Sequence, residues 1–160
     1  MEETSKLARI LVVEDDPAIQ QVICFFLEHN DFEVRQASDG QEAIAVISEF
    51  KPHLIILDLI MRPVSGWDVL HWLRANPLSP QPPVLVLSAL VHLTEQMQGF
   101  EEGAIEYMTK PTQPSMIVER VRAILSLNAE QRLMLQHKRM DEQRKVLERL
   151  QATQRDEFVY

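Results

Sequence analysis

Three carboxylates in this sequence directly follow two short apolar runs. Glu14 and Asp15 come after residues 10–13, and Asp58 comes after residues 54–57. Short, wholly apolar runs are typical of strands buried on both faces of a parallel sheet, and functional groups in such sheets gather beyond the carboxyl ends of the strands. Converging carboxylates repel one another unless a cation lies between them. Mg²⁺ is the expected ion, because it prefers oxygen ligands from one or two carboxylates together with water.

A hydroxyl group and an amine are expected at the same edge of the sheet. Ser88 follows an apolar run at residues 84–87, and Lys110 comes after a short strand predicted at residues 105–108. With a divalent cation bound, Asp58 stays ionised and can attack a phosphorus atom in line, while Lys110 neutralises charge on the transferred group. Ser88 can donate a hydrogen bond to one of its oxygens. Phosphoryl transfer to a carboxylate needs these residue types.

The elements that would position these groups alternate between strand and helix. Strands are predicted at residues 10–13, 32–37, 54–57, 84–87 and 105–108. Capping residues and apolar residues at helical spacing predict helices after Asp16, Asp39 and Ser65, over residues 94–102, and from Pro114 onward. Five strand–helix units in succession predict an α/β fold, a doubly wound five-stranded parallel sheet with right-handed crossovers.

The composition changes after Leu127, where Gly and Pro disappear and Gln, Arg, Glu, Lys and Leu dominate. We therefore predict a domain at residues 7–127 and a helical extension at residues 128–160. A coiled-coil seam is suggested by the 3–4 spacing of nine residues: Ala129, Leu133, Gln136, Met140, Gln143, Leu147, Leu150, Gln154 and Phe158. We expect this helix to continue the last helix of the domain for about 45 Å, as a homodimer contact or a connecting rod. A solvated, partly frayed helix is the alternative.

Charge and cysteine content bound the class of protein. The formal net charge is −8, which argues against a nucleic-acid-binding surface, and we expect no DNA-binding module after the domain. We therefore expect no direct nucleic-acid partner. The single cysteine, Cys24, cannot form an internal disulfide and fits a reducing compartment. No signal peptide or apolar run of about 18 residues is present, so we expect a cytoplasmic protein with no membrane partner.

Four motifs, in order, resemble receiver domains of two-component response regulators over residues 7–127. The motifs are Ile-Leu-Val-Val-Glu-Asp-Asp from residue 10, Leu-Ile-Ile-Leu-Asp-Leu-Ile-Met from residue 54, Leu-Ser-Ala from residue 87 and Tyr-Met-Thr-Lys-Pro from residue 107. The resemblance implies a flavodoxin-like fold with Asp58 as the phospho-acceptor. It also implies that Asp15, Asp58 and the backbone carbonyl of Ile60 bind Mg²⁺, with Glu14 acting through water.

The resemblance further implies that Lys110 and Ser88 hold the phosphoryl group, that Tyr107 moves with Ser88, and that the peptide bond between Lys110 and Pro111 is cis. The expected function is a phosphorylation-controlled switch rather than an enzyme acting on an outside substrate. A sensor histidine kinase or a phosphotransfer protein would donate the phosphoryl group. The face formed by the fourth helix, the fifth strand and the last helix would then rearrange, and the extension would relay the change to dimerisation or another output.

Two positions depart from the family pattern. Arg62 stands where the family usually has proline, with Pro63 after it, and Thr112 stands where an aromatic residue usually follows the lysine–proline pair. Neither change removes a group that the transfer needs. The loop beside Asp58 is expected to take an altered path, or Arg62 to meet the phosphoryl group or a partner.

Other functions stay open at the level of sequence. The chain can be the receiver part of a larger protein such as a hybrid histidine kinase, since residues 155–159 loosely resemble the start of a kinase dimerisation helix, or a scaffold that signals without phosphorylation. A Mg²⁺-dependent phosphohydrolase would usually carry a second acid where Ile60 stands. A flavodoxin-like cofactor binder would meet repulsion between its phosphate and residues 14–16.

Ile60 and Leu90 each stand two residues beyond a site position and offer no polar group to orient an attacking water. We predict that the phospho-aspartate hydrolyses slowly. The loss of acid-labile phosphate with time would measure this rate. A half-life no longer than that of receivers with polar residues at these two positions would refute the prediction.

Overall fold

Five parallel strands form the centre of the molecule in the computed structural model, which describes residues 6–90 and 92–157. The strands are β1 (Arg9–Val13), β2 (Glu33–Ala37), β3 (Leu54–Leu57), β4 (Val84–Ser88) and β5 (Ala104–Thr109). Their order in the sheet is β2-β1-β3-β4-β5. The chain moves outward from β1 to β2 and then returns to the other side of β1, so the carboxyl ends of β1 and β3 flank the point where the strand order reverses. The predicted fold is confirmed.

Five helices connect and cover the strands: α1 (Pro17–His29), α2 (Gly40–Phe50), α3 (Gly66–Ala75), α4 (Leu93–Glu101) and α5 (Pro114–Leu125). The predicted caps are present. The side chain of Asp16 accepts hydrogen bonds from two amides of the first turn of α1, and Ser65 and Asp68 cap α3 reciprocally. These caps fix where each helix begins, directly after a loop that carries site residues.

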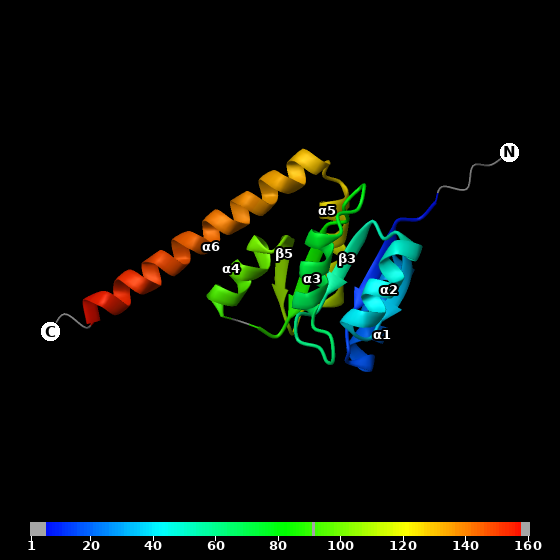
Figure 1. Cartoon of the computed structure of the whole chain (residues 1–160), viewed down its shortest axis with the longest axis horizontal. Helices are drawn as coiled ribbons and strands as arrows, with labels where there is room; N and C mark the ends of the chain where they lie inside the picture. Colours follow the sequence, from blue (N-terminus) through cyan, green and yellow to red (C-terminus); the bar gives the residue numbers. More distant parts are fainter. Residues whose placement is uncertain (1–5, 91, 158–160) are drawn as a thin grey trace.

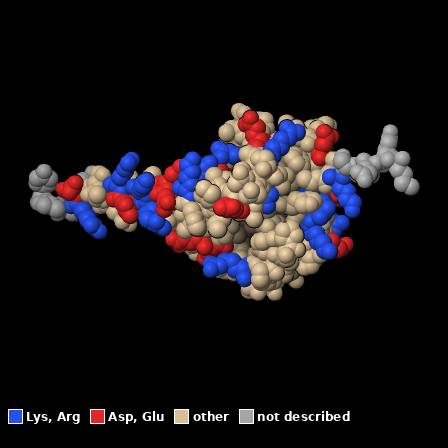
Figure 2. Space-filling view, turned by 90° about the horizontal axis from the view of Figure 1, so that it is seen from above, with Lys and Arg blue, Asp and Glu red and all other residues tan. Residues whose placement is uncertain are grey.

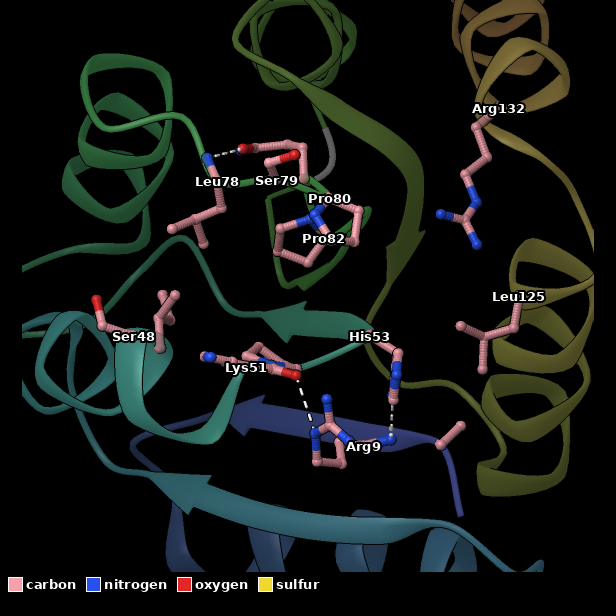
Figure 3. A pocket seen from close by; sticks show the side chains of 14 residues that line it. Arg9, Ser48, Lys51, His53, Leu78, Ser79, Pro80, Pro82, Leu125 and Arg132 are labelled. Carbon is pink, nitrogen blue, oxygen red and sulfur yellow. Dashed lines mark hydrogen bonds between the residues drawn. The ribbon is translucent and has the colours of Figure 1, made fainter. Parts of the chain in front are cut away.

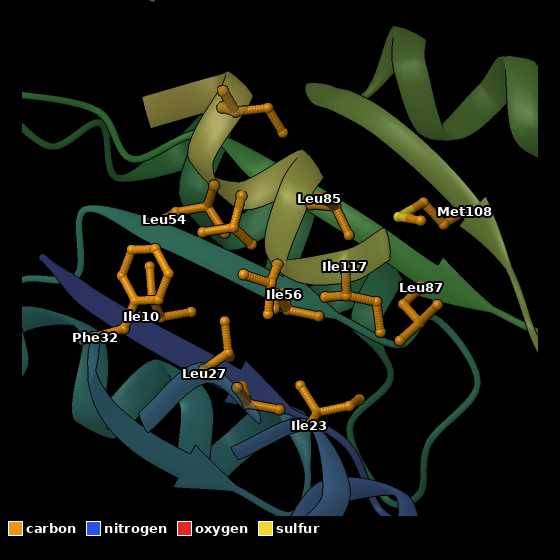
Figure 4. Packing of buried hydrophobic residues seen from close by; sticks show 14 of the residues in the cluster. Ile10, Ile23, Leu27, Phe32, Leu54, Ile56, Leu85, Leu87, Met108 and Ile117 are labelled. Carbon is orange, nitrogen blue, oxygen red and sulfur yellow. The ribbon is translucent and has the colours of Figure 1, made fainter. Parts of the chain in front are cut away.

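Apolar side chains pack on both faces of the sheet, because successive residues of a strand point to opposite sides. Ile10, Leu54 and Leu85 face α1 and α5 (Figure 4), and alternate positions such as Leu11 and Ile55 face α2 and α3. Cys24 lies in the first cluster, and burial, followed by the charge of Glu28, raises the pKa of its thiol to about 11. Cys24 is therefore a small residue of the core.

The C-terminal extension is one long helix, as predicted, but it does not continue α5. The new helix, α6, runs over Ala129–Glu157. The Asn128 side chain accepts a hydrogen bond from the Gln131 amide (2.8 Å), and the Asn128 amide donates to the Gln131 side chain (2.9 Å). This reciprocal cap starts a separate helix. The chain therefore turns at residues 126–128, and Figure 1 shows α6 passing back beside α4.

One side of α6 lies against the domain. Four of the nine predicted seam residues are partly buried: Gln136, Met140, Gln143 and Leu147. Leu133 and Leu150 are exposed, Phe158 lies outside the described residues, and Figure 2 shows charges of both signs along α6. The coiled-coil contact with a second copy and the division at residue 127 stay predictions. None of the helices in the described ranges is long and apolar enough to cross a membrane.

Replacing Leu85, which is fully buried in the core, with alanine should lower the free energy of unfolding by about 2–5 kcal/mol, because a cavity replaces packed side-chain atoms. The matched control is Leu150→Ala on α6, where the side chain is half exposed and the expected loss is below about 0.5 kcal/mol. Equilibrium urea unfolding measures both. Equal losses in the two variants would contradict this assignment of the core.

Candidate functional site

The loop after β1 is held tightly before it enters α1. The Glu14 amide donates to the Ala37 carbonyl at the end of β2 (3.0 Å). The buried amide group of Gln20 donates to the carbonyls of both Glu14 and Ala37 (3.1 Å each). As a result, the Glu14 side chain is held in a buried position while Asp15 is exposed. Gln20 lies on the inner face of α1 and was not predicted as a site residue, because one glutamine on a helix carries no spacing signal.

Asp58 is held at the end of β3 by its own backbone and by the next loop. Its amide donates to the Val13 carbonyl (3.0 Å), and its Oδ1 accepts from the Ile60 amide (3.1 Å). The residue is only 4% exposed. The loop then closes against it: Gly66 lies so near the Asp58 carbonyl that a Cβ atom there would overlap it. Gly66 is therefore a positioning residue that the motif analysis missed.

Lys110, at the end of β5, joins two buried carboxylates. Its Nζ lies 2.7 and 2.9 Å from the two carboxylate oxygens of Glu14 and 3.0 Å from Asp58 Oδ2. Burial alone would lower the Lys110 pKa, but the hydrogen bonds with Glu14 and Asp58 outweigh it, so that the pKa is raised. Burial raises the pKa of Glu14, and the nearby charge of Asp58 adds to this, although Lys110 opposes both. The amine thus makes buried acids tolerable.

The site also has the composition of a cation site. Oxygen atoms of Glu14, Asp15 and Asp58 all lie within 4.8 Å of one another. Three hard oxygen donors, one of them on an exposed side chain, fit a Mg²⁺ ion that keeps several waters. The predicted acidic cluster is therefore confirmed as a cluster. The binding of Mg²⁺ and the part played by the Ile60 carbonyl stay predictions.

Ser88 and Tyr107 lie on neighbouring strands beside this cluster. Ser88 is fully buried, and its carbonyl accepts from the Lys110 amide (2.9 Å), which ties the ends of β4 and β5 together. The Tyr107 hydroxyl donates to the Leu90 carbonyl (3.0 Å) in the loop after β4. Burial raises the Tyr107 pKa to about 12, while the Ser88 hydroxyl acts in the opposite direction. Tyr107 is therefore joined to the loop that Ser88 begins.

The two departures from the family pattern, Arg62 and Thr112, and the predicted cis peptide bond are placed as follows. The peptide bond between Lys110 and Pro111 is cis, as predicted, and the bond between Arg62 and Pro63 is cis as well. Arg62 is exposed and makes no hydrogen bond or ion pair with the described residues. The Thr112 hydroxyl donates to the Thr109 carbonyl. The altered path of the loop beside Asp58 and the contact of Arg62 with a phosphoryl group or a partner stay predictions.

A model of the response regulator receiver domain matches residues 10–122, which include every residue of the acidic cluster. The chain belongs to this family. Receiver domains are signalling domains, so the coarse functional prediction is confirmed.

Two relatives and one solved structure illustrate the match. The DNA-binding dual master transcriptional regulator RpaA of Synechocystis is 40% identical over 119 residues, covering 74% of this chain and 49% of RpaA. The phosphate regulon transcriptional regulatory protein PhoB of Escherichia coli is 36% identical over 117 residues, covering 73% and 51%. A CheY-like receiver domain protein of Methanospirillum hungatei has a TM-score of 0.70 at 27% identity, covering 76% and 95%. The chain spans about half the length of RpaA and PhoB.

The prediction that this receiver has no nucleic-acid partner is contradicted by these relatives. RpaA is named a DNA-binding regulator and PhoB a transcriptional regulatory protein. The prediction rested on the net charge of −8 and on the segment that follows the domain. The charge of a receiver carries no information about nucleic-acid binding elsewhere in a longer protein, and this is why the inference failed.

Replacing Lys110 with methionine should lower the free energy of unfolding by about 1–3 kcal/mol near pH 7 in the presence of EDTA, because two buried carboxylates lose their shared cation. The loss should shrink as the pH falls toward about 5. Lys110 lowers the Glu14 pKa in the wild type, so Glu14 takes up a proton more readily in the folded variant than in the folded wild type, and the variant regains stability as the pH falls.

Urea unfolding at the two pH values measures this effect, with Lys145→Met on the exposed side of α6 as the control. A loss that is the same at both pH values would show that lost packing, rather than unpaired charge, explains the result.

Proposed function

We propose that this receiver is a Mg²⁺-dependent switch that accepts a phosphoryl group on Asp58 from a phosphohistidine donor, on a sensor histidine kinase or a phosphotransfer protein. The observation that carries the proposal is the contact of Lys110 Nζ with Asp58 Oδ2 (3.0 Å) inside the acidic cluster. A buried carboxylate with a cation beside it, at the end of a parallel strand, can be ionised and still be reached by a donor.

In the proposed reaction, a carboxylate oxygen of Asp58 attacks the phosphorus atom of the donor. A new O–P bond forms while the N–P bond to the donor imidazole breaks, and the electron pair leaves with the imidazole nitrogen. Mg²⁺, held by Asp15 and Asp58 with Glu14 through water, would supply charge compensation. Lys110 would turn from Glu14 to the new phosphoryl oxygens, and Ser88 would donate a hydrogen bond to one of them.

We propose that α6 transmits the structural change caused by phosphorylation. α6 is attached to α4 and β5 by polar contacts. The Gln136 side chain donates to the Phe100 carbonyl of α4 (2.8 Å). Arg139 pairs with Glu106 of β5 (3.2 Å), a buried acid that Arg120 of α5 also binds (2.8 Å). These contacts support a position of α6 that depends on α4, β5 and α5 together.

Tyr107 provides the proposed connection between the acceptor site and the contact of α6 with α4 and β5. Its ring lies beside Gly99 and 6.4 Å, centroid to centroid, from the ring of Phe100, whose carbonyl binds Gln136. If Ser88 moves toward the phosphoryl group, Tyr107 loses its place at Leu90 and the α4 backbone shifts under α6. Buried Arg139 Nε lacks a hydrogen-bond partner within the described residues. This supports a contact between α6 and the domain that costs little free energy to break.

The relatives favour a transcriptional role for the protein to which this receiver belongs. RpaA and PhoB carry that role in their names, and about half of their length lies outside the match. We propose that any DNA binding resides outside residues 10–122, and that the receiver controls it.

Incubation with acetyl phosphate and Mg²⁺ should add one acid-labile phosphoryl group to the wild type and none to Asp58→Asn. Intact-protein mass spectrometry measures the adduct, and EDTA should abolish it. Asp141→Asn, on the exposed side of α6, is the control and should be modified normally. An adduct that persists in Asp58→Asn would remove Asp58 from the role of acceptor.

Addition of beryllofluoride with Mg²⁺ should speed amide hydrogen exchange in α6 around residues 136–143. We expect an increase of about tenfold or more if α6 separates from α4 and β5. Exchange in α1 should not change, and Asp58→Asn should show no response. Mass spectrometry of peptic fragments reads all three. Unchanged α6 protection, with the mimic demonstrably bound, would mean that the output leaves by another surface.

A further inference from the structure

A cavity of about 640 Å³ opens at the edge of the sheet opposite to Asp58. It lies at the amino ends of β1 and β3, between the end of α2, the proline-containing loop at residues 78–82 and the first turn of α6 (Figure 3). Its volume is within the range of about 300–1,000 Å³ typical of small-molecule sites. The phosphorylation chemistry proposed above makes no use of it.

The charged residues around this cavity are all basic. Arg9, Lys51 and Arg132 line it together with His53, and no aspartate or glutamate is among the described residues that do so. The whole chain has a net charge of −8, so a cluster of one positive sign is not explained by composition. A concave surface lined by cations attracts anions.

Both arginines are held in place while their outer nitrogens remain available. Arg9 Nε donates to the Phe50 and Lys51 carbonyls at the end of α2 (3.0 Å each), and Arg132 Nε donates to the Ile124 carbonyl at the end of α5 (3.2 Å). Within the described parts of the chain, the terminal nitrogens of both arginines and Lys51 Nζ have no hydrogen-bond or ion-pair partner. Such guanidinium groups are preorganised for an oxyanion, which lowers the entropic cost of binding.

His53 adds a neutral donor to the cluster. Its Nδ1 accepts a hydrogen bond from the Arg9 amide (2.8 Å), so the ring proton lies on Nε2. Burial and then the charges of Arg9 and Arg132 lower the His53 pKa. Arg9, Arg132 and His53 line the same cavity, and Figure 3 shows the His53 ring beside Arg9.

We propose that this cavity binds a small organic phosphate of about nucleoside monophosphate size. The phosphate contacts the outer nitrogens of Arg9 and Arg132, with His53 Nε2 as a further donor. The apolar body of the ligand packs against Ile47, Leu78 and the prolines of the loop, which supply the aliphatic wall of the cavity.

Adenosine monophosphate is the probe, followed by NMR of the His53 ring in the full chain, with inorganic phosphate and adenosine as separate arms. The expected result is a saturable shift of the His53 resonances and a rise in the His53 pKa with the nucleotide. Inorganic phosphate binds more weakly and adenosine does not bind. The Arg132→Gln variant should bind the nucleotide roughly tenfold or more weakly, and Arg74→Gln, an exposed arginine on α3, should bind as the wild type does.

The Lys51→Gln variant keeps the test decisive if an arginine variant fails to fold, because the Lys51 side chain makes no structural hydrogen bond in the described chain; it should also bind more weakly. No saturable shift up to about 10 mM nucleotide, or equal affinity in Arg132→Gln and Arg74→Gln, would overturn the proposal. Inorganic phosphate binding as tightly as the nucleotide would overturn the part that concerns the organic body. Phosphorylation of Asp58 is measured separately, so the failure of either proposal leaves the other intact.

Discussion

The amine of Lys110 between two buried carboxylates is the interaction on which the acidic site depends. Glu14 and Asp58 come from β1 and β3, while Lys110 comes from β5. Without a shared cation, two acids this close could not both stay ionised. Three further contacts hold these groups in place. Gln20 fixes the loop after β1, Gly66 allows the loop after β3 to approach Asp58, and the hydrogen bond of the Lys110 amide joins β5 to β4. The sheet is the frame that brings three distant segments to one point.

The helices α1–α5 and the helix α6 are attached to the rest of the molecule by different kinds of contact. The sheet and α1–α5 pack through continuous apolar clusters, and loss of such contacts is expensive. α6 contacts the domain through hydrogen bonds and ion pairs as well as partly buried apolar side chains such as Leu135, and buried Gln143 Oε1 and Arg139 Nε have no hydrogen-bond partner in the described chain. The contact between α6 and the domain therefore leaves buried polar atoms unpaired, whereas the apolar clusters of the domain do not.

Sequence reasoning found the strands, the helix caps and the acidic cluster, because each depends on local pattern: apolar runs, an aspartate or serine before a helix, and acids at strand ends. It failed where the outcome depends on the placement of distant segments. The turn at Asn128 was available as a capping pattern with Gln131, yet the continuous charged composition suggested an unbroken helix. The roles of Gln20 and Gly66 depend on which loops meet across the sheet, and single residues do not encode that.

Among the described residues, only the first half of α6 is attached to the domain, and the second half extends beyond it. The first half is anchored: the hydrogen bonds between α6 and α4 in the described chain extend as far as Gln143, which donates to Gln96 (3.1 Å), whereas the helix runs on to Glu157. At a rise of 1.5 Å per residue, the overhanging arm is about 20 Å long, so a tilt of roughly 10° at the anchor swings its far end by about 3–4 Å. A change in the tilt of the anchored half is thereby expressed as a displacement of several ångströms at the far end of α6.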